Sequence, residues 1–340
     1  MYIKKIDFQN NILKDYSQII DVRTPNEFNE DSIPTSINQP VLTNLQRKEI
    51  GKIYKEDPFK ARNLGAQKVI QNINKILNRI KLNKSDNILI YCWRGGMRSS
   101  SLYMVLKSIG YNVAMLEKGY KSYRKYINNF FEEDIKTFNF NILSGLTGTG
   151  KTFFLNKMSK FFSVLDIENL AQHKGSILGN LPNIQQPSQK KFESLIWYCL
   201  IKSDLKKKVW VESESNRIGK LFLPNNLFKK MKEGKVYKIE MPIKNRINFI
   251  IKDYEYLIKD KRIVKKSLGV FKRFIPVSEM EKINSFLKNK DFKRFVECLL
   301  KHHYDSVYKK RDIYKKASKI INLQSVNDKS FKFLLDSLKK

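Results

Sequence analysis

The residues whose chemistry stands out first are one cysteine and two arginines around a pair of glycines. Cys92 is followed by Arg94, by glycines at 95–96 and by Arg98. Glycines let successive backbone N–H groups turn toward one point, and the arginines add positive charge there. A thiol in such a cradle is expected to be held as the thiolate, the nucleophilic form of cysteine. The sequence therefore predicts that Cys92 is a nucleophile rather than a buried structural cysteine. The residues expected to surround the Cys92 sulfur and any group bound to it are Trp93, Arg94, Gly95, Gly96, Met97, Arg98 and Ser99.

A second stretch with chemically meaningful spacing is 145–152, which fits the pattern G-x-x-x-x-G-K-[ST]. Backbone N–H groups of such a loop wrap a phosphate, and Lys151 places its ammonium group on it. Thr152 can reach a magnesium ion. The pattern predicts a phosphate site without saying which phosphate compound binds. The residues expected to bind this phosphate group are Gly145, Gly148, Thr149, Gly150, Lys151 and Thr152.

Both loops lie between a predicted strand and a predicted helix. The apolar run 87–91 predicts a buried strand that ends at Cys92, and apolar residues at helical spacing over 99–109 predict the helix that follows. Further strands are predicted at 18–23 and 112–116. Strands and helices that alternate in this way indicate an open α/β sheet. An insert at 43–82 is predicted to form two helices, and Thr24 is a candidate N-cap with Pro25 at the first helical position.

The second loop is predicted to belong to another α/β unit. A strand at 138–144 leads into the phosphate loop, and strands at 163–168 and 208–212 follow. Asp166 and Glu212 stand at the ends of those two strands, where ligands bind in open α/β sheets. Either carboxylate could fill the metal-side acidic role beside the phosphate loop, and the alternative is a solvated carboxylate of a loop. His173 and Arg217 are further candidates, because they lie in polar loops that are rich in hydrogen-bond donors.

Charge and composition point to a polyanionic partner. The chain has 340 residues, with 66 Lys and Arg against 33 Asp and Glu, and a formal net charge of +33. About half of this excess is explained by the Lys-, Asn- and Ile-rich composition that AT-rich coding sequences produce. The remainder favours nucleic acid as the binding partner. The stretches 259–273 and 288–316 are basic, and the second is interleaved with aromatic residues, as suits RNA contact. The residues expected to contact RNA are Lys265, Lys266, Lys272 and Arg273.

The sequence also argues against several classes of protein. No apolar leader and no run of about 20 apolar residues is present, so a soluble, cytoplasmic protein without membrane contact is expected. Three scattered cysteines do not make a disulfide framework, and three histidines do not combine with them into a zinc pattern. No metal-binding cluster is predicted from these residues.

The loop after Cys92 resembles the active-site loop of rhodanese-like domains, which carry sulfur or selenium on the cysteine. Residues 21–28, followed by Ile33 and Pro34, resemble a second rhodanese signature, with Ser32 where such domains usually have His. The Cys-x5-Arg spacing also fits Cys-dependent phosphatases, which usually have His where Tyr91 stands.

The combination of this loop with the phosphate loop resembles the tRNA 2-selenouridine synthase family over about residues 15–245. The stretch 165–176 is similar to that family, and so are 186–189 with 192–193, 212–215 and 217–219. The expected organisation is a rhodanese-like domain at 1–128 with the insert 43–82, a P-loop NTPase-like α/β domain at 129–245, and a helical, basic region at 246–340.

The resemblance implies a two-step change of the wobble 2-thiouridine in tRNAs of the Lys, Glu and Gln type. Geranyl diphosphate first alkylates the sulfur, and selenium from selenophosphate then replaces it by way of a Cys92 perselenide. The resemblance implies no tightly bound cofactor and no obligate protein partner. It leaves open whether a magnesium ion binds. Two alternatives stay open: a rhodanese-type sulfurtransferase coupled to a P-loop kinase or NTPase, and a tRNA-binding protein with a vestigial catalytic loop.

Overall fold

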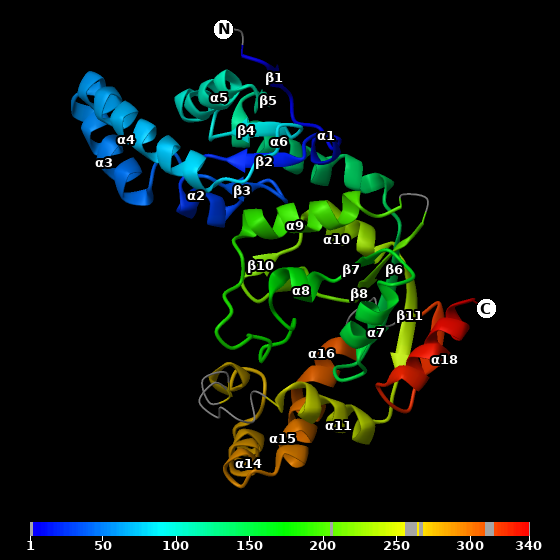
Figure 1. The fold of residues 1–340 in the computed structure, drawn as a ribbon. Coiled ribbons are helices and arrows are strands. Elements are labelled where there is room, and N and C mark those ends of the chain that lie inside the picture. Colours follow the sequence, from blue (N-terminus) through cyan, green and yellow to red (C-terminus); the bar gives the residue numbers. More distant parts are fainter. Residues whose placement is uncertain (1–2, 205–206, 256–263, 265–267, 310–315, 340) are drawn as a thin grey trace. The chain divides into compact units, whose positions relative to one another are not determined.

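The computed structural model describes residues 3–204, 207–255, 264, 268–309 and 316–339 (Figure 1). Contacts divide the chain into two compact units. Unit 1 consists of Met1–Glu133 and Ser188–Ile201, and unit 2 consists of Asp134–Pro187 and Lys202–Lys340. No described helix is long and apolar enough to cross a membrane.

Unit 1 is built on a parallel five-stranded sheet with the order β1-β5-β4-β2-β3. The strands are β1 (Lys5–Ile6), β5 (Asn112–Leu116), β4 (Asn87–Tyr91), β2 (Gln18–Asp21) and β3 (Ile37–Asn38). β4 is the central strand, paired with β2 at Ile20 and Ile90 and with β5 at Ile88 and Val113. Its last four residues are buried, as is usual in a parallel sheet that is covered on both faces. The predicted strands at 87–91 and 112–116 are thereby confirmed, and the one predicted at 18–23 is confirmed over Gln18–Asp21.

Helices cover this sheet, and two further helices form the insert. They are α1 (Ile12–Asp15), α2 (Pro25–Glu30), α3 (Asn44–Glu56), α4 (Pro58–Arg79), α5 (Met97–Ile109), α6 (Gly119–Glu132) and α9 (Gln189–Ile201). α3 and α4 are the two helices predicted in the insert, and they pack against each other (Figure 1). α2 begins with the predicted cap: Thr24 accepts from the backbone of Glu27, whose side chain returns to Thr24 in a capping box. An apolar core, which includes Ile20, Ile90 and Leu102, joins one face of the sheet to α4 and α5.

The helix α9 is distant in sequence from the rest of unit 1. Its Trp197 is fully buried and packs edge-on against Tyr123 and Tyr126 of α6, with Phe8 close by. Arg124 of α6 also forms an ion pair with Glu193 of α9. The chain therefore leaves unit 1 after α6, returns for α9 and then completes unit 2.

Unit 2 contains a second parallel five-stranded sheet, with the order β12-β11-β6-β8-β7. The strands are β12 (Lys319–Asn322), β11 (Lys235–Glu240), β6 (Phe140–Gly145), β8 (Val209–Glu212) and β7 (Val164–Leu165). Its other elements before residue 254 are η1 (Asp134–Thr137), α7 (Lys151–Met158), α8 (Ile167–Ala171), the antiparallel pair β9 (Arg217–Ile218) and β10 (Leu221–Phe222), α10 (Asn225–Lys232) and α11 (Ile243–Asp253). The predicted α/β class is confirmed for both units.

The end of the chain is mostly helical, as expected, but it also adds a strand to the sheet. Its helices are α14 (Val277–Lys288), α15 (Phe292–Leu299), the π-helix η2 (Leu300–Tyr304), α16 (Asp305–Lys309) and α18 (Asp328–Lys339). α14, α15 and η2 share a separate apolar core with α11. β12 pairs in parallel with β11, and the sequence did not indicate it because only Ile321 in this short strand is buried.

Candidate functional site

The Cys92 loop lies at the carboxyl end of the central strand β4 and leads into α5. The start of α6 holds the loop: Tyr120 N donates to Cys92 O at 2.8 Å, and Lys121 N donates to Trp93 O at 3.1 Å. Gly119 makes this approach possible, because it has a φ of +54° and an added Cβ would lie 2.3 Å from Cys92 O. The loop conformation is therefore fixed by backbone contacts on the side away from α5.

The sulfur of Cys92 lies at the start of α5 and is largely shielded from water. The residue is 3% exposed, and Ser99 Oγ lies 3.2 Å from Sγ and 3.0 Å from Gly96 O, so its one hydroxyl proton can be donated to either acceptor. Gly96 is the N-cap of α5, so the positive end of a 13-residue helix lies beside the thiol. A donor hydroxyl and a helix N-terminus both stabilise a negative sulfur, which is the property that a nucleophilic cysteine needs.

Arg98, predicted to belong to the cradle, makes a bidentate ion pair with Glu27. Its two terminal nitrogens lie 2.8 and 3.2 Å from the carboxylate oxygens of Glu27. Burial acts to raise the pKa of Glu27, but the hydrogen bonds and charge of Arg98 outweigh it, and the pKa is lowered. The pair ties the first turn of α5 to α2. Arg94 and Met97, in contrast, are exposed.

A hollow of about 640 Å³ opens around this loop. Arg94 and Arg98 line it together with Cys92, and Arg47 of α3 adds a third guanidinium. Glu27 and Glu30 also line the hollow, and Glu27 is paired with Arg98. Arg47 and Arg94 beside the sulfur nucleophile suit a small anion such as a phosphate or a selenophosphate. Arg47 was not predicted, because within the insert it is indistinguishable from the other basic residues of a charged helix.

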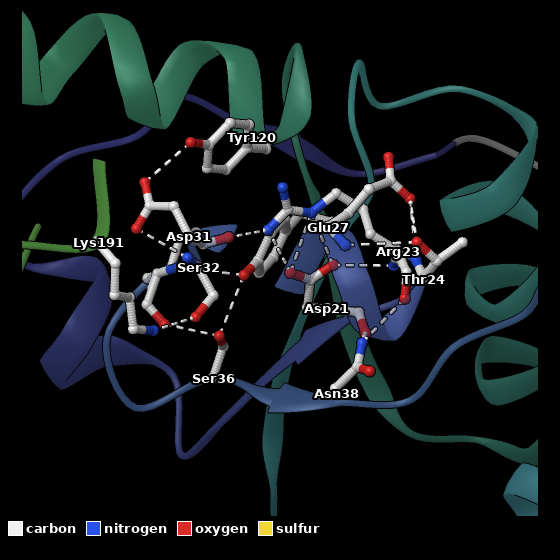
Figure 2. A network of polar contacts seen from close by, with 12 residues as sticks. Asp21, Arg23, Thr24, Glu27, Asp31, Ser32, Ser36, Asn38, Tyr120 and Lys191 are labelled. Atoms are coloured by element: carbon white, nitrogen blue, oxygen red, sulfur yellow. Dashed lines mark hydrogen bonds and ion pairs between the residues drawn. The ribbon is translucent and has the colours of Figure 1, made fainter. Parts of the chain in front are cut away.

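A buried polar network connects Asp21, Arg23 and Asp31 with Tyr120 (Figure 2). Asp21 and Arg23 form an ion pair at 2.6 Å, with side chains 0% and 1% exposed. Burial raises the pKa of Asp21 even though Arg23 opposes the shift. The guanidinium of Arg23 lies 4.0 Å from the ring centre of Tyr120 and donates to Asp31 O at 2.6 Å. The network therefore fixes the residue that anchors Cys92 O.

Ser32, the position that departs from the rhodanese pattern, has a partner from α9. Lys191 Nζ donates to Ser32 Oγ at 2.7 Å, as Figure 2 shows. The next residue back, Asp31, accepts from the hydroxyl of Tyr120 at 2.8 Å. Tyr91, which stands where phosphatases usually have His, is fully buried, and its hydroxyl accepts from Ile33 N at 3.1 Å. Both departures therefore take part in packing and hydrogen bonding around the loop.

The second site, in unit 2, is the phosphate loop between β6 and α7. Gly148 and Gly150 have φ values of +85° and +77°, which turn the loop backbone into the left-handed conformation. Lys151 is buried, and its Nζ donates to Gly145 O at 3.1 Å and lies 5.1 Å from the ring centre of Tyr308. The lysine thus lies folded over the loop where a phosphate binds in proteins with this pattern.

Three carboxylates gather beside Thr152. Its hydroxyl lies 3.1 Å from Glu168 Oε2 and 3.2 Å from Glu212 Oε2, and Glu214 completes a cluster whose oxygens lie within 4.8 Å of one another. Burial, followed by the charge of Glu214, raises the pKa of Glu212 to about 8. Burial and the charges of Glu212 and Glu214 likewise raise the pKa of Glu168.

This donor set fits a magnesium ion. Glu212 is 1% exposed, and its Oε1 has no hydrogen-bond partner among the described residues. An unpaired buried carboxylate oxygen beside two further carboxylates and a hydroxyl is costly unless a proton, as the raised pKa of Glu212 allows, or a cation binds there. Hard oxygen ligands of this kind are those that Mg²⁺ prefers.

The predicted polar residues of unit 2 fall in different places. Glu212 lies in the carboxylate cluster, whereas Asp166 accepts from Asn169 N at 3.0 Å and caps α8. His173 is buried and Arg217 is exposed, and neither lines the cavity around Lys151 as the described residues define it. Burial lowers the pKa of His173.

Glu168 and Glu214 join the cluster although sequence reasoning did not select them. Both lie two residues beyond an acidic residue that was selected, Asp166 and Glu212. The available signal was this repetition of acidic residues at the ends of two neighbouring strands.

The predicted RNA-binding residues are only partly described. Lys272 and Arg273 are exposed and follow the buried Phe271. Lys265 and Lys266 lie outside the described residues.

Comparison with known proteins agrees with both units. A rhodanese-like domain model matches residues 6–126, and a model described as the tRNA 2-selenouridine synthase AAA domain matches residues 138–271. The sheet with its cysteine loop and the sheet with its phosphate loop thus define a rhodanese-like domain joined to an AAA-type P-loop domain.

Relatives over both domains narrow this class to one family. The tRNA 2-selenouridine synthase of Shewanella piezotolerans is 30% identical over 341 residues, which cover 89% of this chain and 90% of that protein. The Marinobacter nauticus protein of the same name is 33% identical, covering 73% and 68%. The Nitrosomonas europaea protein is 31% identical over 69% of this chain, and the match spans 63% of that relative's length, a little under two thirds. The chain belongs to the tRNA 2-selenouridine synthase family.

Proposed function

We propose that this protein converts the wobble 2-thiouridine of tRNA into 2-selenouridine in two steps. Unit 2 transfers a geranyl group from geranyl diphosphate to the 2-thio sulfur, and unit 1 supplies selenium from selenophosphate. The support is the family to which the chain belongs, together with the presence of both a complete phosphate loop and an intact Cys92 loop. The proposed tRNAs are those of the Lys, Glu and Gln type.

The geranyl step needs a site that stabilises departing diphosphate. A sulfur at C2 leaves poorly, and alkylation converts it into a better leaving group. Lys151 and the N–H groups of the loop at 148–151 would neutralise the charge that develops on the diphosphate. Thr152, Glu168, Glu212 and Glu214 would hold Mg²⁺, which when bound supplies further positive charge to the phosphates. No hydrolysis of ATP is required for this chemistry.

The selenium step uses the thiolate of Cys92. We infer that the sulfur holds the selenium atom as a perselenide, with Ser99 and the start of α5 stabilising the negative charge. Perselenide selenium is two electrons more oxidised than the selenium of selenophosphate. Loading therefore needs a disulfide as oxidant: selenium would displace a thiol from a mixed disulfide of Cys92, and water would take the phosphoryl group as phosphate. The selenium would then bond to C2 as geranyl thiol departs, and a further thiol would cleave the S–Se bond and so return the two electrons.

The observation that carries this proposal most is the buried thiol of Cys92 beneath the Ser99 hydroxyl, in a chain of this family. Incubation of 2-thiouridine-containing tRNA with the protein and geranyl diphosphate alone should yield geranylated 2-thiouridine by mass spectrometry of the nucleosides. If the product appears only when ATP is added, the alternative of a sulfurtransferase coupled to a P-loop NTPase gains support instead.

A further inference from the structure

Unit 2 has two cavities that adjoin each other. The first, of about 480 Å³, is lined by the phosphate loop, Lys151 and the three glutamates together with apolar side chains. The second, of about 60 Å³, lies among the helices α11, α15 and η2. Both cavities are lined by the same five residues at their junction, which are Thr147, Ser176, Ile250, Tyr254 and Tyr304.

The second cavity is apolar away from this junction. Its walls include Leu178, Phe295, Val296 and Leu299, and the last three are at most 9% exposed. A narrow apolar space gives water few hydrogen-bond partners, whereas a hydrocarbon chain gains free energy by entering it. The polar groups of the lining are confined to the end that faces the phosphate loop.

Direct contacts hold this helical region against the phosphate loop. Arg246 of α11 donates to Thr147 O at 3.0 Å and makes a bidentate ion pair with Asp305 of α16, at 2.9 and 2.8 Å. Ile250 packs so closely on Gly148 that an added Cβ would lie 2.7 Å from its Cδ1. The apolar cavity is therefore held at a fixed place relative to the phosphate site.

A rare local structure shapes the boundary between the two cavities. The π-helical turn Leu300–Tyr304 follows α15, and such turns occur frequently at functional sites. Leu300 lines the apolar cavity, His303 lines the first cavity, and Tyr304 lines both. This short segment thus contributes side chains to the linings of both cavities.

We propose that the apolar cavity receives the hydrocarbon chain of a prenyl diphosphate whose diphosphate group lies on the phosphate loop. This inference rests on the proposed function and assigns the chain-binding residues of the same site. A nucleotide does not suit the cavity, because the donors and acceptors of its base and ribose would face an apolar wall. The combined site is complementary to a molecule with one charged end and one apolar end.

Calorimetric titration with geranyl diphosphate and with inorganic diphosphate, each with Mg²⁺, tests the proposal. The wild-type protein should bind geranyl diphosphate at least about 100-fold more tightly, which corresponds to roughly 2.7 kcal/mol. Val296→Trp fills the cavity and should reduce this preference to less than about tenfold, or roughly 1.4 kcal/mol, with unchanged affinity for inorganic diphosphate. Val277→Trp is the matched control, because Val277 is 76% exposed on α14 and should leave the preference intact.

Each outcome separates this inference from the function on which it rests. If Val296→Trp loses diphosphate binding through misfolding, Leu178→Trp decides, since Leu178 lines the same cavity but is only half-buried. An unchanged preference in a folded variant overturns the inference, as does a wild-type protein that binds both ligands equally. A wild-type protein that binds neither ligand overturns the diphosphate role of unit 2 as well.

Discussion

At the scale of single residues, Ser99 is the side chain whose hydroxyl contacts the sulfur of Cys92. A hydrogen bond to a charged acceptor contributes about 1.5–3 kcal/mol, so Ser99→Ala should slow selenium transfer by roughly tenfold or more. Rates of 2-selenouridine formation on pre-geranylated tRNA would measure this. Ser101→Ala is the control, because its hydroxyl donates to Met97 O on the same helix. Equal rates for the two variants would exclude a role of Ser99 at the sulfur.

The ion pair between Glu27 and Arg98 predicts a dependence of stability on pH. The pKa of Glu27 in the folded protein is lowered from 4.5, so the pair stabilises the fold above that pH. The contribution is lost as the pH falls through the folded-state pKa. Glu27→Gln should lower the free energy of unfolding by about 1–3 kcal/mol at pH 7.

Urea denaturation between pH 7 and pH 3 measures this difference. The gap between the wild type and Glu27→Gln should shrink as the pH falls below 4.5. A gap that stays constant over this range would show that the carboxylate is not stabilised by Arg98.

In unit 2, Lys151 and Lys157 lie on the same helix but have different surroundings. Lys151 is buried over the phosphate loop, whereas Lys157 pairs with Asp328 at 2.7 Å and is partly exposed. Lys151→Ala should reduce geranylation by about 100-fold or more, the usual scale for removing one transition-state donor. It should affect selenation of tRNA that is already geranylated much less. Lys157→Ala should leave both rates near wild type, and equal loss of both steps in Lys151→Ala would indicate a shared structural role.

At the scale of elements, α9 is expected to support the Cys92 unit although it lies far away in sequence. Its fully buried Trp197 contacts Phe8, Tyr123 and Tyr126. Trp197→Ala should cost about 3–5 kcal/mol. Hydrogen exchange should then quicken in β4 and β2, with little change in β6 and β11. Leu195→Ala, at a half-buried position of the same helix, should have a smaller effect. Faster exchange confined to unit 2 strands would contradict the placement of α9 in unit 1.

The elements that the sequence predicted are those with a strong local pattern. β4, β5 and β8 are apolar runs between polar breaks, and α2 carries its capping box in four consecutive residues. β12 was missed because one buried residue makes no pattern. α9 belongs to unit 1 because of contacts between side chains that are far apart in the sequence. A local sequence pattern does not predict such contacts.

The carboxylates of unit 2 show that the sequence did not predict the exact end of a strand. A strand was expected over 163–168 with Asp166 at its tip. The strand β7 ends at Leu165, and α8 begins at Ile167, so Asp166 becomes the helix cap and Glu168 lies beside Thr152. The sequence could predict that acidic residues lie at the edge of the sheet. To predict which of them contacts Thr152, the last residue of the strand must be known to within one position.

At the scale of the whole molecule, the formal charge of +33 predicts salt-dependent binding to tRNA. Each neutralised phosphate should contribute a slope of about −0.7 to −0.9 in log affinity against log salt. Reversal of Lys265, Lys266, Lys272 and Arg273 to Glu should weaken binding and flatten that slope. Filter binding at several salt concentrations measures both quantities.

The control for charge reversal is the affinity for geranyl diphosphate, which should be nearly unchanged in the same variant. Wild-type affinity for tRNA with an unchanged slope would contradict a contact in this region. The basic residues to test next would then be Arg62, Arg79 and the stretch 121–125.

The central claim is that one chain carries out two separable steps, with the diphosphate handled by the phosphate loop and the selenium by Cys92. The most direct test is mass spectrometry of tRNA nucleosides after incubation with geranyl diphosphate, selenophosphate, and the disulfide and thiol that the selenium step consumes. The wild type should yield 2-selenouridine. Cys92→Ser should stop at geranylated 2-thiouridine, because a serine hydroxyl cannot carry selenium as a perselenide. Formation of 2-selenouridine by Cys92→Ser at the wild-type rate would contradict the account.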